Sequence, residues 1–298
     1  MEFVKTSTLI ELYCTVCQCN DSRYLEATQR RSNNCHPQFT DEELITVYVW
    51  GTMQRQFTRK AIYEYTRLHW SEWFPKLPSY QAFCRRLNRL TPAFRALSEI
   101  WMEEKQHNGG LHTDFVVDSC PIILAKQVRS DRAKVGRELC EKCYNASRKE
   151  WYYGVKLHLF AQLRPRQLPF PRAFSVSGAA MCDLWAAKQI MFDSRPISHG
   201  TLFADKAYLD ADWAHTLHSE FALDIVLPRK KTKNDVLLSA DTLSSAVSAR
   251  RQPVESFFHW LQCKTDFQNA SAVRSLAGLV FHVFAKCAAA LFSLLFYY

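Results

Sequence analysis

The hydrophobic pattern of the chain changes near Asn108-Gly109-Gly110, and this change constrains the fold more than any other feature. Before it, apolar residues recur with the spacing of amphipathic helices. After it, short apolar runs of strand length alternate with helical stretches. The glycine pair is the clearest boundary signal in the chain. We therefore predict two domains, an all-helical one over residues 1–110 and an α/β one over residues 111–298.

The first domain contains several expected helix starts. Thr40 precedes an acidic turn with Glu43 three residues later, which is the pattern of a capping box. Ser79 is expected to cap a helix over residues 80–90. This helix carries three arginines that we interpret as DNA contacts, with a solvated helix face as the open alternative: Arg85, Arg86 and Arg89. The expected helices of this domain span residues 8–16, 40–51, 58–69, 80–90 and 92–105.

The second domain alternates strands and helices. Expected strands cover residues 115–119, 152–162, 173–177, 202–204 and 223–227, and expected helices cover 181–192 and 211–219. Residues 126–150 are polar and charged and are expected to form a loop or flap. Two helices follow, and the last one, over residues 276–298, is interrupted by His282 and Lys286, which favours a buried helix over a membrane span. This order predicts a mixed sheet flanked by helices.

Three carboxylates stand in contexts that favour a metal site over a solvated surface. Asp118 and Asp205 each close a short apolar run, and Glu255 lies at the start of an amphipathic helix, with Pro253 expected in its first turn. Asp114 shares a strand face with Asp118, but it lies near the strand's start, so we prefer Asp118. Carboxylates at the ends of buried strands need partners, which a pair of Mg²⁺ ions would supply. Two such ions are the usual catalytic cofactors of enzymes that cleave and join phosphodiesters.

The charge of the chain points to a polyanionic partner without proving one. The formal net charge is +9 over 298 residues. Residues 1–110 hold 14 Lys and Arg against 12 Asp and Glu, a net of +2, whereas residues 111–298 hold 24 against 17, a net of +7. The basic excess thus surrounds the three carboxylates, as a phosphate-bearing substrate would require. Ordinary solubility charge is an equally open interpretation.

Eleven cysteines, without a visible signal peptide, indicate a reducing cytosol and free thiols. Cys14 and Cys17 fall in a helical pattern that predicts thiols on the core side. Zinc binding by these cysteines, or by Cys140 and Cys143, is the less favoured alternative, because a structural zinc needs four placed ligands.

Four segments, in the correct order, resemble motifs of the DDE transposases encoded by bacterial insertion sequences. They are residues 117–121, 153–158 and 204–208, and Arg251 followed by Glu255 four residues later. In addition, residues 73–80 with Arg85 and Arg86 resemble the helical N-terminal region of the nine-eighty-two group of insertion sequences. The resemblance covers nearly the whole chain.

This resemblance implies a ribonuclease H-like catalytic core preceded by an all-helical domain that binds DNA ends. It implies Mg²⁺-dependent phosphodiester hydrolysis and strand transfer at the element's ends, using two Mg²⁺ ions, with Mn²⁺ as a substitute. The implied partners are double-stranded DNA at the ends and the target, and further copies of the chain in a homodimer or larger synaptic complex. No membrane partner is implied, and the expected location is the bacterial cytoplasm, at the nucleoid. The implied catalytic and metal-binding residues are Asp118, Asp205 and Glu255.

Three positions depart from the family pattern: Ala207, Ser248 and Gln262. They leave open the alternative that the chain is a catalytically decayed transposase that only binds DNA. A stand-alone nuclease of the same fold is a weaker alternative. Three further residues are predicted to contact DNA: Lys156, His158 and Arg251. For Lys156 and His158, which share one sheet face, a solvated face is the alternative; for Arg251 it is a surface ion pair.

Overall fold

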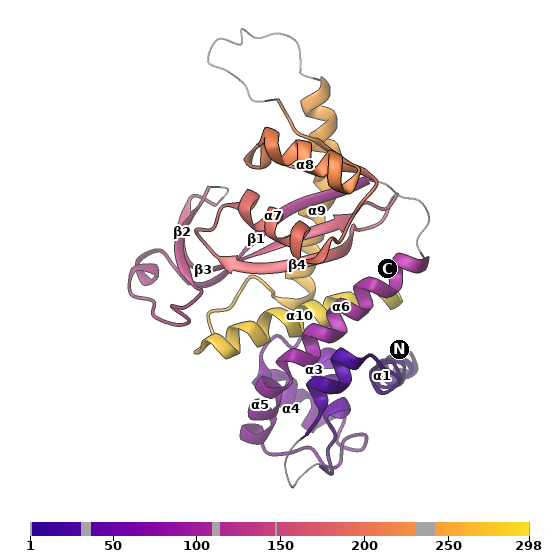
Figure 1. Ribbon diagram of the computed structural model, residues 1–298. Coiled ribbons are helices and arrows are strands. Elements are labelled where there is room, and N and C mark those ends of the chain that lie inside the picture. Colours follow the sequence, from indigo (N-terminus) through magenta and orange to yellow (C-terminus); the bar gives the residue numbers. More distant parts are fainter. Residues whose placement is uncertain (1, 31–36, 109–113, 147, 230–241, 298) are drawn as a thin grey trace. The chain divides into compact units, whose positions relative to one another are not determined.

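The structure is a computed structural model that describes residues 2–30, 37–108, 114–146, 148–229 and 242–297 (Figure 1). It divides into two compact units. Unit 1 comprises Met1–Glu104, Leu261–Phe267 and Val273–Tyr298, and unit 2 comprises Lys105–Trp260 and Gln268–Ala272. The expected boundary glycines, Gly109 and Gly110, lie outside the described residues. The C-terminal segment belongs to unit 1 in this division, whereas we expected it to belong to the second domain.

Unit 1 is built from helices, and several of the predicted starts are confirmed. Thr40 and Glu43 form the reciprocal hydrogen bonds of a capping box, and the Thr58 and Ser79 hydroxyls each accept a backbone N–H in the next turn. A short helix, α2, was not predicted. The helices are α1 (Glu2–Cys17), α2 (Ser22–Thr28), α3 (Asp41–Met53), α4 (Arg59–His69), α5 (Tyr80–Arg89), α6 (Thr91–Asn108) and α10 (Leu276–Tyr297).

The orientation of the thiols in α1 was predicted wrongly. The buried face of this helix consists of Leu9, Leu12 and Val16, which recur at helical spacing. Cys14 and Cys17 lie on the other side and are exposed. The larger aliphatic side chains bury more apolar area than the thiols and therefore set the rotation of the helix.

Helix α10 is long and apolar enough to cross a membrane by length and composition alone, with a mean hydropathy of 2.0, but 72% of that window is buried inside the protein. Its polar interruptions have partners within unit 1. Lys286 donates to the carbonyl oxygen of Asp266 at 2.8 Å, and His282 Nε2 lies 2.7 Å from the carbonyl oxygen of Phe267. Burial in the core of unit 1 thus accounts for the composition of the helix.

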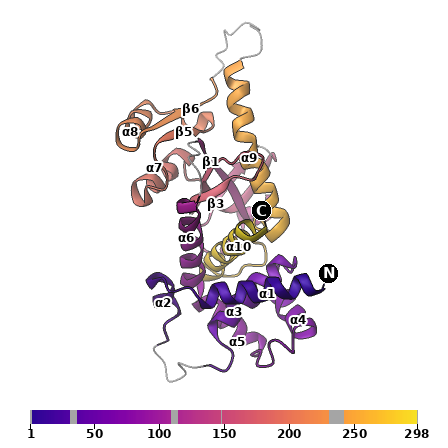
Figure 2. The ribbon, with the colours of Figure 1, turned by 90° about the vertical axis from the view of Figure 1, so that its right-hand side faces the viewer.

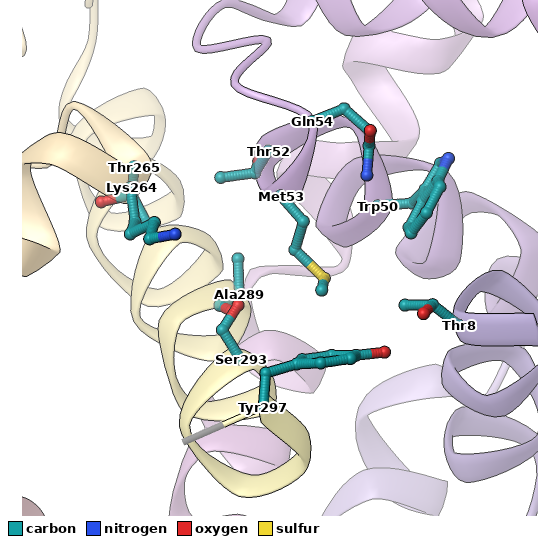
Figure 3. A pocket seen from close by; sticks show the side chains of 10 residues that line it. All are labelled: Thr8, Trp50, Thr52, Met53, Gln54, Lys264, Thr265, Ala289, Ser293 and Tyr297. Carbon is teal, nitrogen blue, oxygen red and sulfur yellow. The ribbon is translucent and has the colours of Figure 1, made fainter. Parts of the chain in front are cut away.

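A pocket of about 210 Å³ opens in unit 1, and Figure 3 shows Met53 and Tyr297 bordering it. Its lining carries hydroxyl, amide and thioether groups with a single ammonium and no carboxylate. It therefore does not have the donor set of a metal-dependent phosphodiester site. The lining residues are Thr8, Trp50, Thr52, Met53, Gln54, Lys264, Thr265, Ala289, Ser293 and Tyr297.

Unit 2 contains a six-stranded mixed sheet with helices, as predicted. Strand β3 pairs antiparallel with β1, β2 and β4, whereas β1, β5 and β6 run parallel, in the order β2-β3-β1-β5-β6. The elements are β1 (Asp114–Lys126), η1 (Gln127–Asp131), β2 (Glu141–Asn145), β3 (Glu150–Gln162), β4 (Phe170–Gly178), α7 (Asp183–Ser194), β5 (Gly200–Phe203), η2 (Lys206–Tyr208), α8 (Ala211–Phe221), β6 (Leu223–Val226) and α9 (Thr242–Thr265).

Three sequence predictions for this unit were wrong in extent. Strand β1 continues to Lys126, so Asp118 lies within the strand rather than at its end. The expected flap over residues 126–150 contains the strand β2. Helix α9 begins at Thr242, which puts Pro253 deep inside the helix instead of in its first turn. The upstream turns of α9 are rich in serine, and their few apolar residues, such as Leu243 and Val247, gave only a weak helical signal.

The two faces of the sheet have different coverings. Phe115 and Val117 of β1 belong to a core cluster with residues of α7 and α8. Because strand side chains alternate, Asp118 points to the other face. Figure 2 shows α9 on the opposite side of the sheet from α7 and α8. Asp118 therefore faces the helix that carries Arg251 and Glu255.

Candidate active site

Asp118 and Asp205 are brought together by the pairing of two parallel strands. In the register of β1 with β5, Val116 lies opposite Phe203. Asp118 and Asp205 each follow two residues later, so the same register continued places them side by side at the carboxyl end of β5. Asp205 caps the short helix η2 by accepting the Lys206 N–H at 2.7 Å. Asp118 likewise accepts the Ser119 N–H, at 2.8 Å.

A single guanidinium joins the two carboxylates. Arg251 Nη2 lies 3.3 Å from Oδ2 of Asp118, and Nη1 lies 3.6 Å from Oδ1 of Asp205. The Arg251 side chain is only 14% exposed, so this is not the surface ion pair that the sequence left open. The arrangement shows that one cationic centre can serve both carboxylates at once.

Burial is the largest influence on the pKa of the Asp118 carboxyl. It raises the pKa of Asp118 to about 6, and the neighbouring charges of Asp205 and Asp183 act in the same direction. The Ser119 N–H and the Arg251 guanidinium oppose this rise but do not cancel it. The ionised form of Asp118 is thus under-compensated, which is the condition in which an additional cation would be stabilising.

Tyr208, in the segment that follows Asp205, adds a polar group to the same region. Its hydroxyl is buried without a hydrogen-bond partner among the described residues. Burial, with a smaller effect of Asp118 and Asp183, raises the pKa of Tyr208 well above its usual value. The phenol therefore stays protonated and keeps a donor for an oxygen ligand.

Asp183 lies at the centre of a charged network on the α7 side of the sheet. Its Oδ1 accepts hydrogen bonds from Lys156 Nζ at 2.8 Å and from Ser119 Oγ at 3.1 Å. His158 Nδ1 lies 3.7 Å from the same oxygen, and His158 Nε2 lies 2.7 Å from Ser177 Oγ. Through the Ser119 hydroxyl, the structure thus connects Asp183 to the residue next to Asp118.

Lys156 and His158 do not form a solvated face. Both side chains lie against Asp183; the Lys156 side chain is 14% exposed, and His158 has no exposed surface. Burial lowers the pKa of His158 to about 4, with Lys156 reinforcing the effect and Asp183 opposing it. The imidazole is therefore neutral near pH 7, and the ammonium of Lys156 supplies the positive charge beside Asp183.

Glu255 is not gathered with the two aspartates. It is exposed on α9, one turn after Arg251, so its side chain leaves the helix on the same face as Arg251. The opposite face is buried as predicted, through Val254, Phe257 and Phe258. Within the part of the chain that the structure describes, no three His, Cys, Asp or Glu side chains are close enough to hold a metal ion.

The three arginines of α5 differ in their surroundings. Arg86 and Arg89 pair with the buried carboxylate of Asp41, which Arg30 also contacts. Arg85 is exposed. Arg86 and Arg89 thus already compensate a buried acid, although the Arg89 side chain is 38% exposed, whereas no ion pair of Arg85 is found among the described residues.

Comparison with known proteins identifies a family. The model of the family described as transposase DDE domain matches residues 109–270, which is more than half of the chain and includes all three predicted catalytic acids. No curated protein matches the chain, and no solved structure does.

Proposed function

The chain belongs to the family of transposase DDE domains, and on that premise we propose that it hydrolyses phosphodiesters at the ends of an insertion sequence and transfers the freed strands into target DNA. The family generally uses divalent metal ions. The observation that carries the proposal is the pairing of Asp118 with Asp205 across two parallel strands, with one guanidinium between them.

We further propose that unit 2 is a ribonuclease H-like core. Its sheet supports this interpretation, since three antiparallel strands, β4, β3 and β1, continue into the parallel pair β5 and β6. Asp118 lies within the central strand β1, and Asp205 follows β5, so both acids stand at the carboxyl end of β5, where a ligand site is expected in an open mixed sheet. Glu255 comes from the following helix.

The chemistry of the Asp118 and Asp205 pair suits a divalent ion, and Glu255 would have to approach this pair to complete the ligand set. The carboxylate of Asp118 is buried and under-compensated, Asp205 shares its cation, and the Tyr208 hydroxyl is buried without a partner among the described residues. Asp118, Asp205 and Glu255 would hold two Mg²⁺ ions, or Mn²⁺ in their place, which activate water or a 3′-hydroxyl and stabilise the leaving oxygen. Arg251 would then be available to bind a phosphate oxygen, for which its planar guanidinium is suited.

The remaining parts of the molecule would serve DNA binding and assembly. We propose that the N-terminal helices, through Arg85 in particular, bind double-stranded DNA at the element's ends. Homodimers or larger complexes would pair these ends, in the bacterial cytoplasm at the nucleoid. The N-terminal likeness to the nine-eighty-two group supports this division, and the basic excess of residues 111–298 suits the same polyanion.

A strand-cleavage assay with end DNA and Mg²⁺ tests the catalytic proposal. Asp118→Asn, Asp205→Asn and Glu255→Gln should each lower cleavage by at least about 100-fold, in line with the loss of one component of a metal site. The matched control is Asp114→Asn, which changes an acid on the same face of β1, four residues earlier. Cleavage retained by Asp118→Asn or Asp205→Asn would overturn the assignment.

The alternative function, a decayed transposase that only binds DNA, has its own supporting observation. Glu255 is exposed and is not gathered with the two aspartates, and Ala207, Ser248 and Gln262 depart from the family pattern. A wild-type protein that binds end DNA but does not cut it with Mg²⁺ or Mn²⁺ would favour this alternative.

A further inference from the structure

Two large aromatic side chains lie exposed near the tip of the hairpin formed by β2 and the start of β3. The register places Tyr144 opposite Trp151. Their ring centroids are 5.3 Å apart, and Lys142 Nζ lies 4.7 Å from the centroid of the Trp151 ring. Tyr144 is 47% exposed and Trp151 is 50% exposed. We call Lys142, Tyr144 and Trp151 the aromatic hairpin.

The packing of the hairpin does not require these rings to be aromatic and exposed. Its other face forms a small core, in which Tyr152 and Cys143 pack with Ile123. On the side of the aromatic hairpin, the neighbouring Tyr153 is covered, since its hydroxyl donates to the carbonyl oxygen of Val135 at 3.1 Å. Tyr144 and Trp151 lie beyond this contact, nearer the tip of the hairpin, and their apolar ring surface is in contact with water.

The charge of the segment around the aromatic hairpin indicates which class of partner binds there. Residues 126–150 hold eight Lys and Arg against four Asp and Glu. Three of these acids have contacts within unit 2: Asp131 with Lys142, Glu150 with Lys126, and Glu141 with the Ala180 N–H. The exposed basic side chains of the same segment include Arg129, Arg132, Lys134 and Arg137. This combination of exposed rings and excess positive charge suits a nucleic acid strand.

We propose that the aromatic hairpin binds unpaired bases of the DNA substrate, with Trp151 and Tyr144 stacking on the bases and the basic side chains of residues 126–150 contacting phosphates. The proposal rests on the proposed function, in which DNA is the substrate. A fully paired duplex offers phosphates but hides the faces of its bases. Exposed rings therefore gain binding energy only where bases are unpaired, as at a frayed or cut end.

A second copy of the chain is the less suitable occupant of this surface. A symmetric dimer would place the same basic segments of two copies beside each other, and like charges in contact are unfavourable. A DNA strand supplies the opposite charge instead. The choice between the two is an outcome of the experiment below.

The experiment compares three fluorescent oligonucleotides at one fixed salt concentration, using the full chain: a paired duplex, the same duplex with three unpaired nucleotides at its end, and the single strand. Anisotropy gives the Kd values. Trp151→Leu should weaken binding to the two substrates with unpaired bases by about 5- to 100-fold and leave the paired duplex nearly unchanged. Trp151→Phe, which keeps a stacking ring, should restore most of the loss. The matched control is Trp185→Leu, which removes a tryptophan of 66% exposure from α7 in the same unit.

Three results would overturn the proposal. Trp151→Leu could weaken all three substrates equally, which would make the residue a part of general DNA binding or of the fold. It could change nothing, or it could change the oligomeric state in light scattering, which would assign the surface to a second copy. If the wild type binds none of the three oligonucleotides, the proposed function itself fails, so the two failures are distinguishable.

Discussion

At the scale of single residues, Asp118 combines a predicted role in function with a cost to stability. The folded state keeps a proton on this carboxyl up to about pH 6, whereas an unfolded aspartate loses it near pH 4. Between these values the folded state binds the extra proton, so the free energy of unfolding falls as the pH rises from about 4 to 6. Above about pH 6 the free energy of unfolding stays lower by the full amount of this effect.

Asp118→Asn should therefore stabilise the metal-free protein near pH 7 by on the order of 1–3 kcal/mol while abolishing cleavage. The side chain is 23% exposed, so solvent screening leaves most of this effect in place. The gain should become small near pH 4, where the carboxyl of the folded wild type is protonated and uncharged like the asparagine. Urea denaturation at the two pH values measures it, with Asp114→Asn as the control. An Asp118→Asn protein less stable than the wild type near pH 7 would contradict the argument.

Asp183 is expected to be a positioning residue for Asp118. Asp183→Ala leaves the partly buried ammonium of Lys156 with the carbonyl oxygen of Met181 and removes the acceptor of the Ser119 hydroxyl. We expect a loss of stability of about 1–3 kcal/mol, together with a lower kcat at saturating DNA. The matched control is Asp193→Ala, which removes an exposed acid from the other end of α7. Equal effects of the two substitutions in denaturation and cleavage assays would exclude the positioning role.

At the scale of elements, features that depend on neighbouring residues could be predicted from the sequence, whereas contacts between distant segments could not. Thr40, Thr58 and Ser79 mark helix starts because a cap and its partner lie within one turn of the chain. The apolar runs that precede Asp118 and Asp205 were also visible in the sequence, but the strand register that pairs the two acids was not. The position of Arg251 between the two acids was not visible either, because it depends on how a helix 133 residues after Asp118 packs on the sheet.

Helix α9 gives a prediction at this scale. Pro253 lacks an N–H, so the carbonyl of Ala249 loses its helical partner. Pro253→Ala should stabilise the protein by about 1–3 kcal/mol, provided that the wild-type helix is otherwise regular. Thermal unfolding measures this, with the exposed Gln252→Ala as the control. If cleavage falls while stability rises, the proline has a role in orienting Glu255; unchanged stability would contradict the predicted cost.

At the scale of the whole molecule, the last helix determines which part of the chain folds as a unit. The sequence predicted a helical domain that ends at residue 110, because the change of pattern there is local. The sequence did not show to which domain α10 belongs, because its apolar residues could be buried in the core of either domain. In the structure, Phe281 of α10 packs against Tyr48 at 4.8 Å and Phe94 at 5.5 Å between ring centroids, and the Arg59 guanidinium lies 4.2 Å from its ring.

Residues 1–110 expressed alone should therefore fail to fold cooperatively, since they lack the helix on which α3 packs. In the full chain, Phe281→Ala should cost about 3–5 kcal/mol, because it leaves a cavity among these aromatic rings. Phe296→Ala is the matched control on the same helix, and its partly exposed ring should cost less than about 1.5 kcal/mol. Circular dichroism during thermal unfolding measures both. A cooperative transition in the 1–110 fragment would show that the helices of unit 1 need no partner from the C-terminal segment, and would support the boundary that the glycine pair suggested.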